Sequence, residues 1–248
     1  MSAAAPPVPV AVTWHDAECG GYAQDLPVWE RLAGERDGPV LDLGAGTGRV
    51  ALHLAERGHD VVAVDLDADL IAALRTRAAE RDLDAGAEVG DARELDLGRR
   101  FPLIIAPMQL MHMLGGGDER LATLRAVVSH LEPDGIFAAA ILQEPLPPSG
   151  PTEALPDVRD VGGWIHSSLP LEVRVGDADL EIHRLRQLVA PDGSLSEELD
   201  VTAVDRLQPG VLEAEAERCG LRVTGSEPIG ETDEHVGSLL LLMERAGG

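Results

Sequence analysis

Residues 39–52 read PVLDLGAGTGRVAL, and they carry the clearest structural signal in the chain. A short apolar run, three glycines at alternate positions and then a helical pattern indicate a buried strand that turns sharply into a helix. Gly44, Gly46 and Gly48 lack Cβ atoms, so the backbone there can adopt unusual dihedral angles and a ligand can lie directly against it. Because the first turn of the following helix points its N–H groups at the same place, we expect a ligand to bind there.

The rest of the chain alternates between short apolar runs and longer stretches with helical spacing. Strands that alternate with helices form βαβ units with right-handed crossovers and a parallel sheet covered on both faces. The pattern therefore predicts an α/β, Rossmann-like sheet of seven strands. The expected strands are the one that opens at residue 39 and those at residues 61–65, 87–92, 101–106, 136–142, 221–224 and 238–244, and the expected helices are at 25–33, 47–57, 68–81, 118–131 and 209–219.

The alternation stops at a proline-rich segment, residues 144–151. Three extended runs follow, within residues 169–175, 180–189 and 195–203, and turn sequences separate them. They predict a small antiparallel β insertion between strands 5 and 6 of the large sheet. We expect an N-terminal arm and lid helix at residues 1–35, a core at residues 36–146 and 207–248, and a substrate-capping insertion at residues 147–206.

Composition excludes several classes of partner. The 248-residue chain carries a formal net charge of −24, which repels polyphosphates at long range, so no nucleic-acid partner is expected. A membrane-spanning helix needs about eighteen apolar residues in a row, and no apolar run in the chain approaches that length. The first residues also lack the pattern of a secretory signal peptide. We therefore expect a cytoplasmic protein without a membrane partner. Cys19 and Cys219 have no metal-ligand spacing, so no metal is expected. The sequence indicates no oligomeric state.

The glycine spacing discriminates between two classes of cofactor. A dinucleotide-binding turn follows Gly-x-Gly-x-x-Gly, which would require glycine at position 49, where this chain has Arg49. Asp42, just before the turn, suits a ligand with an ammonium group better than one with a pyrophosphate. At the next two strand ends, Asp65 can accept hydrogen bonds from both hydroxyls of a ribose, and Asp91 can accept from an adenine amino group.

At these positions the chain resembles the class I S-adenosylmethionine-dependent methyltransferases of the small-molecule type. Residues 40–49 resemble the first motif of that family, residues 61–65 its ribose-binding strand, residues 90–92 its adenine-contacting loop and residues 212–223 its late helix and sixth strand. The resemblance implies S-adenosyl-L-methionine as cofactor, S-adenosyl-L-homocysteine as product, and a seventh strand that is antiparallel in a mostly parallel sheet. The residues expected to bind the cofactor are Tyr22, Asp42, Gly44, Ala45, Gly46, Asp65, Leu66, Asp91, Ala92 and Pro107.

The resemblance also implies individual roles. The backbone of Gly44 to Gly46 would pack on the methionine part of the cofactor, Leu66 would lie against the adenine, and the Ala92 amide would read the adenine edge. Tyr22 stands in the arm among the few aromatic residues, where it either caps a bound ligand or anchors the arm to the core. Pro107 ends the fourth strand, at the exit where this family handles its acceptors.

Methyl transfer from a sulfonium is an in-line displacement, so the enzyme mainly aligns the acceptor and excludes water. A base is needed only when the acceptor must first lose a proton, as a hydroxyl does. His112 is the candidate base, and its alternative is a structural histidine between two methionines. Further candidates, each also explained as the polar face of a half-exposed strand, are Gln143, Glu144, His166, His183, Arg184 and Arg186.

The sequence therefore predicts an S-adenosylmethionine-dependent methyltransferase (EC 2.1.1.-) that acts on an O or N atom of a small-molecule acceptor. One alternative is a catalytically silent protein that binds the same cofactor in regulation or assembly. A second alternative is an NAD-linked oxidoreductase, which Arg49 disfavours. Methylation of a protein side chain also stays open, because an acidic surface does not repel basic proteins.

Overall fold

The computed structural model describes residues 5–146, 148–232 and 235–247; residues 1–4 of the expected arm and Pro147 of the expected insertion lie outside them. The chain divides into two compact units. We call Ala23–Leu146 with Asp205–Gly248 the core unit, and Met1–Tyr22 with Pro147–Val204 the antiparallel unit.

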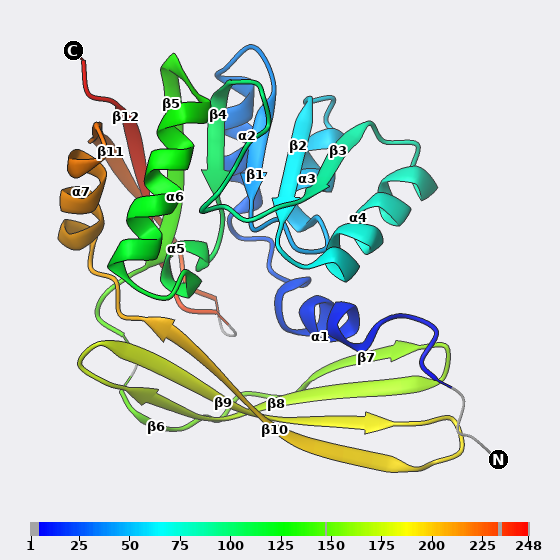
Figure 1. Cartoon of the computed structure of the whole chain (residues 1–248). Coiled ribbons are helices and arrows are strands. Elements are labelled where there is room, and N and C mark those ends of the chain that lie inside the picture. Colours follow the sequence, from blue (N-terminus) through cyan, green and yellow to red (C-terminus); the bar gives the residue numbers. More distant parts are fainter. Residues whose placement is uncertain (1–4, 147, 233–234, 248) are drawn as a thin grey trace. The chain divides into compact units, whose positions relative to one another are not determined.

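The core unit is built on a seven-stranded sheet with the strand order β11-β12-β5-β4-β1-β2-β3 (Figure 1). Strands β1 to β5 pair in parallel, whereas β12 is antiparallel to both β5 and β11. The expected α/β, Rossmann-like and mostly parallel sheet is thus confirmed. Its strands are β1 (Val40–Leu43), β2 (Val61–Asp65), β3 (Ala85–Val89), β4 (Phe101–Ala106), β5 (Leu131–Leu142), β11 (Leu221–Ile229) and β12 (Ser238–Arg245).

Helices cover both faces of this sheet, because successive strand residues alternate between two apolar cores. Trp29 and Ile71 belong to the core on one face, and Met111 and Leu212 belong to the core on the other. The helices of the first face are α2 (Leu26–Gly34), α3 (Arg49–Ala55) and α4 (Ala68–Glu80), and those of the second are α5 (Leu110–Met113), α6 (Gly117–His130) and α7 (Pro209–Arg218). Among the described residues, no helix has the length and apolar character that a membrane crossing requires.

The boundary between α6 and β5 differs from the prediction. The helix ends at His130, and the strand begins at Leu131 rather than at residue 136. Leu131 is fully buried and pairs with Phe101 at the start of β4. Helical spacing alone counts Leu131 as the last apolar residue of the helix, but pairing with the neighbouring strand holds its backbone extended.

The antiparallel unit has more strands than expected. Its sheet runs in the order β10-β9-β8-β6, and β7 also pairs with β8 (Figure 1). Two consecutive glycines, Gly162 and Gly163, connect β7 to β8 with φ of 62° and 83°, which is the signature of a two-residue hairpin. This signal is present in the sequence and was missed. The strands are β6 (Gly150–Pro151), β7 (Asp157–Val161), β8 (Trp164–Val175), β9 (Asp179–Val189) and β10 (Leu195–Asp205).

A helix that the sequence pattern does not predict, α1 (Val10–Cys19), packs against β7 and β8 of the same unit. Val12 and Trp14 are buried. The Trp14 ring meets the His166 ring edge-on, with the ring centroids 4.9 Å apart. Apolar residues in this segment follow no clear helical period, so the contact with the sheet stabilises the helix more than its own sequence does.

Candidate functional site

The turn between β1 and α3 adopts a left-handed backbone at each of its glycines. The φ angle is 65° at Gly44, 57° at Gly46 and 91° at Gly48. A Cβ atom at Gly44 would lie 2.9 Å from Leu110 Cδ1, and one at Gly48 would lie 2.6 Å from the Cγ of Leu74. Backbone conformation and close packing therefore both require glycine at these two positions.

Asp65 ends β2 and is held in place by the glycine turn. Its Oδ2 accepts a hydrogen bond of 2.8 Å from the Gly46 amide, and its Oδ1 accepts one of 2.9 Å from the Asp67 amide. Because each carboxylate oxygen can accept more than one hydrogen bond, the fixed group can still receive the two hydroxyls of a diol. Leu66, the next residue, is 65% exposed. A fixed carboxylate beside an exposed apolar side chain suits a ligand that carries both a ribose and a flat ring.

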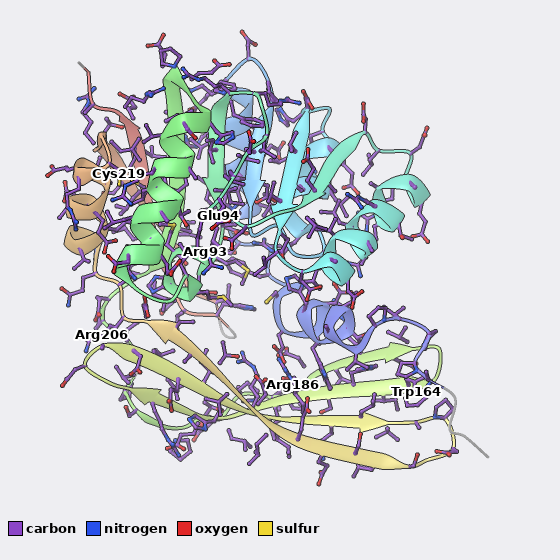
Figure 2. All side chains as sticks on the ribbon, viewed as in Figure 1. Arg93, Glu94, Trp164, Arg186, Arg206 and Cys219 are labelled. Atoms are coloured by element: carbon purple, nitrogen blue, oxygen red, sulfur yellow. The ribbon has the colours of Figure 1, made fainter. Side chains whose placement is uncertain are left out.

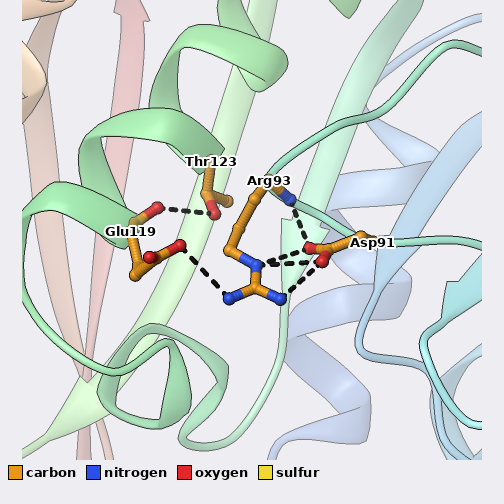
Figure 3. A network of polar contacts seen from close by, with 4 residues as sticks. All are labelled: Asp91, Arg93, Glu119 and Thr123. Carbon is orange, nitrogen blue, oxygen red and sulfur yellow. Dashed lines mark hydrogen bonds and ion pairs between the residues drawn. The ribbon is translucent and has the colours of Figure 1, made fainter.

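Asp91 follows β3. Arg93, two residues later in the sequence, hydrogen-bonds its carboxylate (Figure 3). The Arg93 Nε donates to Oδ1 at 2.8 Å, and its Nη2 donates to Oδ2 at 2.5 Å. Arg93 also donates through Nη1 to Glu119 Oε2, 3.2 Å away on α6. These bonds to Arg93 lower the pKa of the Asp91 carboxyl. Arg93 therefore fixes the side chain that we expect to read the adenine, a role that sequence reasoning missed.

Replacing Arg93 with alanine is expected to weaken binding of S-adenosylhomocysteine about tenfold, because Asp91 then loses the charged hydrogen bonds that orient it. Isothermal titration calorimetry on the wild type and the variant checks this. Arg100→Ala, a change of an exposed arginine later in the same loop, is the matched control and should bind as the wild type does. Equal affinity for Arg93→Ala and the wild type would show that Asp91 needs no such support.

A buried ion pair lies beside the glycine turn. Arg49 donates to both carboxylate oxygens of Asp25, at 2.5 and 2.8 Å, and the Trp29 indole donates to the same carboxylate at 2.8 Å. The side chains of Arg49 and Asp25 are only 9% and 2% exposed. Asp25 thus ties the start of α2 to the start of α3. Sequence reasoning missed Asp25, because nothing local relates it to a partner 24 residues away.

Asp42 lies beneath the same turn with 1% of its surface exposed. Neither carboxylate oxygen makes a hydrogen bond of normal geometry with a described residue, although the Ala51 amide is close enough to favour the ionised form slightly. Burial raises the pKa of Asp42 to about 8, with Arg49 opposing the rise and Asp25 and Asp65 adding to it. A buried carboxyl group without a partner favours a ligand with positive charge, since a cation close to the turn stabilises the ionised form.

Backbone groups hold both ring nitrogens of His112. The residue is 2% exposed; its Nε2 accepts a 2.9 Å hydrogen bond from the Leu142 amide, and its Nδ1 lies 2.7 Å from the Asp205 carbonyl, to which it donates. Both nitrogens are thereby committed to backbone groups, and neither is left to take a proton from an acceptor. The alternative of a structural histidine therefore fits the geometry, and the hypothesis of a base at this position finds no support in it.

His112 should make stability fall on acidification. Burial lowers its pKa, and the charge of Arg120 adds to the effect, against the hydrogen bond to Asp205. A lowered pKa means that the unfolded state binds more protons, so the stabilisation is present above the unfolded pKa of about 6.5 and is lost as pH falls below it. Urea unfolding between pH 7 and pH 5 should show a shallower loss for His112→Gln than for the wild type. Identical losses would contradict the assignment.

The remaining expected residues divide between the two units. Ala45 and Ala92 lie in the loops after β1 and β3, and Pro107 directly follows β4, so these residues share the carboxyl-end edge of the core sheet with Asp65. Tyr22 belongs to the antiparallel unit, where it is 6% exposed. Met108, which the sequence did not single out, has a φ of 54°. A bulky residue in this conformation is uncommon and often marks a functional site.

Residues 40–135 match the family model of the methyltransferase domain. This range runs from β1 to the first residues of β5, and it contains the glycine turn and the carboxylates at the ends of β1 to β3. This segment is therefore similar to methyltransferase domains, in agreement with the resemblance to class I S-adenosylmethionine-dependent methyltransferases.

Solved structures share the fold over nearly the whole chain. A sugar N-methyltransferase from Streptoalloteichus has a TM-score of 0.75 at 20% identity, with 100% of this chain and 96% of that chain covered. An S-adenosylmethionine-dependent methyltransferase from Clostridium acetobutylicum has a TM-score of 0.72 at 16% identity, with 95% and 97% covered.

Curated relatives are similar over shorter stretches. A dTDP-3-amino-3,6-dideoxy-alpha-D-glucopyranose N,N-dimethyltransferase from Streptomyces fradiae is 33% identical over 114 residues, which are 46% of this chain and 43% of the relative. A cypemycin N-terminal methyltransferase from a Streptomyces species is 35% identical over 96 residues, which are 39% of this chain and 38% of the relative. The chain thus spans less than half the length of these relatives.

Proposed function

We propose that the protein is an S-adenosylmethionine-dependent methyltransferase that acts on a small-molecule acceptor. The observation that carries the proposal is the Asp65 carboxylate, which the Gly46 amide fixes at 2.8 Å beside the exposed Leu66. The pair provides acceptors for a ribose diol and an apolar surface for adenine. Asp42, whose buried carboxylate makes no hydrogen bond of normal geometry with a described residue, supports a cationic tail rather than a pyrophosphate at the glycine turn.

S-adenosylmethionine, when bound, supplies a methyl group that is already activated by its sulfonium. The residues of this chain then have three tasks. Asp65 binds the ribose, Asp91 with its support from Arg93 orients the adenine, and the glycine turn lets the backbone approach the methionine part closely. Good alignment of the acceptor with the methyl carbon supplies several kcal/mol of the barrier, on the order of 7 or more in the best cases.

We infer that the acceptor atom is a nitrogen. A neutral amine attacks the methyl group before it loses its proton, so the chemistry needs no strong base at the moment of transfer. This agrees with His112, whose ring nitrogens are both hydrogen bonded to the backbone. Two of the similar proteins, those of Streptomyces fradiae and of Streptoalloteichus, are named as N-methyltransferases of sugars, whereas a relative from Nitrobacter winogradskyi is named as an O-methyltransferase.

Release of S-adenosylhomocysteine from S-adenosylmethionine tests the function across a panel of acceptors. Amines, amino sugars among them, should give product, and phenols and carboxylic acids should give less. Turnover of phenols alone would contradict the nitrogen assignment. Tight cofactor binding without turnover of any acceptor would favour the silent cofactor-binding alternative.

We also propose that the protein acts in the cytoplasm and independently of nucleic acid. Cys19 and Cys219 are thiols, which supports a reducing compartment. The net charge of −24 supports a partner other than a polyphosphate polymer.

A further inference from the structure

Arg184 lies on β9 of the antiparallel unit, on the face of the sheet that α1 covers. Side chains two residues apart in a strand point to the same side of the sheet, so Arg184 lies on the same face as Arg186. Arg186 is paired in register with Ser168 of β8, and both side chains hydrogen-bond the Glu18 carboxylate of α1. Figure 2 labels Arg186 on this sheet.

Arg186 is fully engaged by acidic partners. Its Nε and Nη2 donate to the two oxygens of Glu18 at 2.8 and 2.9 Å, and its Nη1 donates to Asp200 Oδ1 at 2.7 Å. The guanidinium also lies over the Trp14 ring, 5.5 Å from its centroid. Its charge is thus balanced, and its donors are used inside the unit.

Arg184 differs from Arg186 in this respect. Its Nε is buried and has no hydrogen-bond partner among the described residues. Burial alone would raise the pKa of the Glu18 carboxyl, yet the hydrogen bonds from Arg186 and Ser168 and the charge of Arg184 lower it on balance. Arg184 is therefore near Glu18 but is not hydrogen bonded to it.

The backbone opposite Arg184 is irregular. Its partner in register on β8 is Pro170, and the register between β8 and β9 shifts between Pro170 and Glu172. Such a bulge bends the strand and redirects side chains, and bulges are common next to binding sites. Proline also supplies no N–H group at this point.

We propose that Arg184 is the centre of an oxyanion-binding site on the α1 face of the antiparallel sheet. A buried guanidinium N–H without an acceptor is costly, and its best complement is a planar or tetrahedral oxyanion that accepts two parallel hydrogen bonds. The site holds the carboxylate or phosphate group of a small-molecule ligand.

Arg174 provides a matched control. It stands on β8 opposite Glu181, and it is exposed and paired with Glu172 at 2.9 Å. Ile182 is two residues from Arg184 and shares its face of the sheet, and Val173 pairs with Ile182 on that face. Arg174 is the next residue after Val173, so its side chain lies on the opposite face. Arg174→Gln removes the same charge from the same sheet without touching the proposed site.

The test uses inorganic phosphate and acetate as probes on the full chain, at constant ionic strength, with the thermal midpoint as readout. Phosphate, acetate or both should raise the midpoint of the wild type and of Arg174→Gln. Arg184→Gln should bind the probe about tenfold more weakly. Arg184→Lys keeps the charge but loses the fork of donors, so it should be intermediate and also serves if the glutamine variant fails to fold.

Each outcome has a defined meaning. A response to phosphate only assigns a phosphate group, and a response to acetate only assigns a carboxylate. The site is refuted if neither probe affects the wild type, or if the Arg184 variants respond as the wild type does. The midpoint shift with S-adenosylhomocysteine is recorded on the same samples. If S-adenosylhomocysteine does not shift the midpoint, the proposed function is weakened, but the result with phosphate and acetate can still be interpreted.

Discussion

Replacing Asp65 with alanine is expected to weaken binding of S-adenosylhomocysteine by about 100-fold or more. Asp65 is held by the amides of Gly46 and Asp67, so its carboxylate is already oriented before a ligand arrives. A hydrogen bond to a charged group contributes about 1.5–3 kcal/mol, and two hydroxyls of a ribose would each make one. Since about 1.4 kcal/mol is a factor of ten in affinity, two such bonds account for the expected loss.

Calorimetric titration of the wild type and Asp65→Ala measures this loss. Asp67→Ala is a suitable control, because the Asp67 side chain caps α4 through the amides of Asp69 and Leu70 and has no part in the proposed ribose contacts. The control should lose about 1 kcal/mol of stability and keep its affinity. A variant without Asp65 that still binds as tightly as the wild type would remove the ribose-binding assignment.

Replacing Asp25 with alanine is expected to lower the free energy of unfolding by about 3–5 kcal/mol, because it leaves the buried charge of Arg49 without a partner. For a chain of this size the thermal midpoint should fall by about 10 °C. The Trp29 indole also loses its acceptor. Since Asp25 helps to raise the pKa of Asp42 while Arg49 opposes it, the same change should lower the pKa of Asp42.

Glu30→Ala is the matched control for this prediction. Glu30 pairs with Arg57 at 2.6 Å, but the two side chains are 44% and 39% exposed, and exposed pairs contribute about 0–1 kcal/mol. Chemical denaturation of both variants separates the two cases. If Asp25→Ala lowers the free energy of unfolding no more than Glu30→Ala does, solvent or Asp42 must compensate the charge of Arg49, and the prediction is wrong.

The core sheet could be predicted because its signals are local. The apolar run of β1, the glycine turn and the helix that follows lie within fourteen residues, 39–52, and each later strand repeats the pattern. Asp42, Asp65 and Asp91 could be predicted as one group because parallel strands place their carboxyl ends along the same edge. The exact ends of the elements were less predictable, as Leu131 shows, because a residue at a boundary follows its tertiary partner.

Contacts across long stretches of chain account for what was missed. The partners of His112, Leu142 and Asp205, are 30 and 93 residues away, and nothing in the local sequence distinguishes a backbone-bound histidine from a base. Asp25 is hidden for the same reason. The hold of Arg93 on Asp91, by contrast, spans only two residues, and the Asp-x-Arg spacing is a signal that sequence reasoning could have used.

We propose above all that the strand ends of β1, β2 and β3 bind an adenosyl group with a cationic tail. Calorimetric titration of the purified protein with S-adenosylhomocysteine and, separately, with NAD distinguishes this ligand from a dinucleotide. We expect saturable heat with S-adenosylhomocysteine, loss of that heat in Asp65→Ala, and none with NAD. Binding of NAD by the wild type, with no heat from S-adenosylhomocysteine, would contradict it.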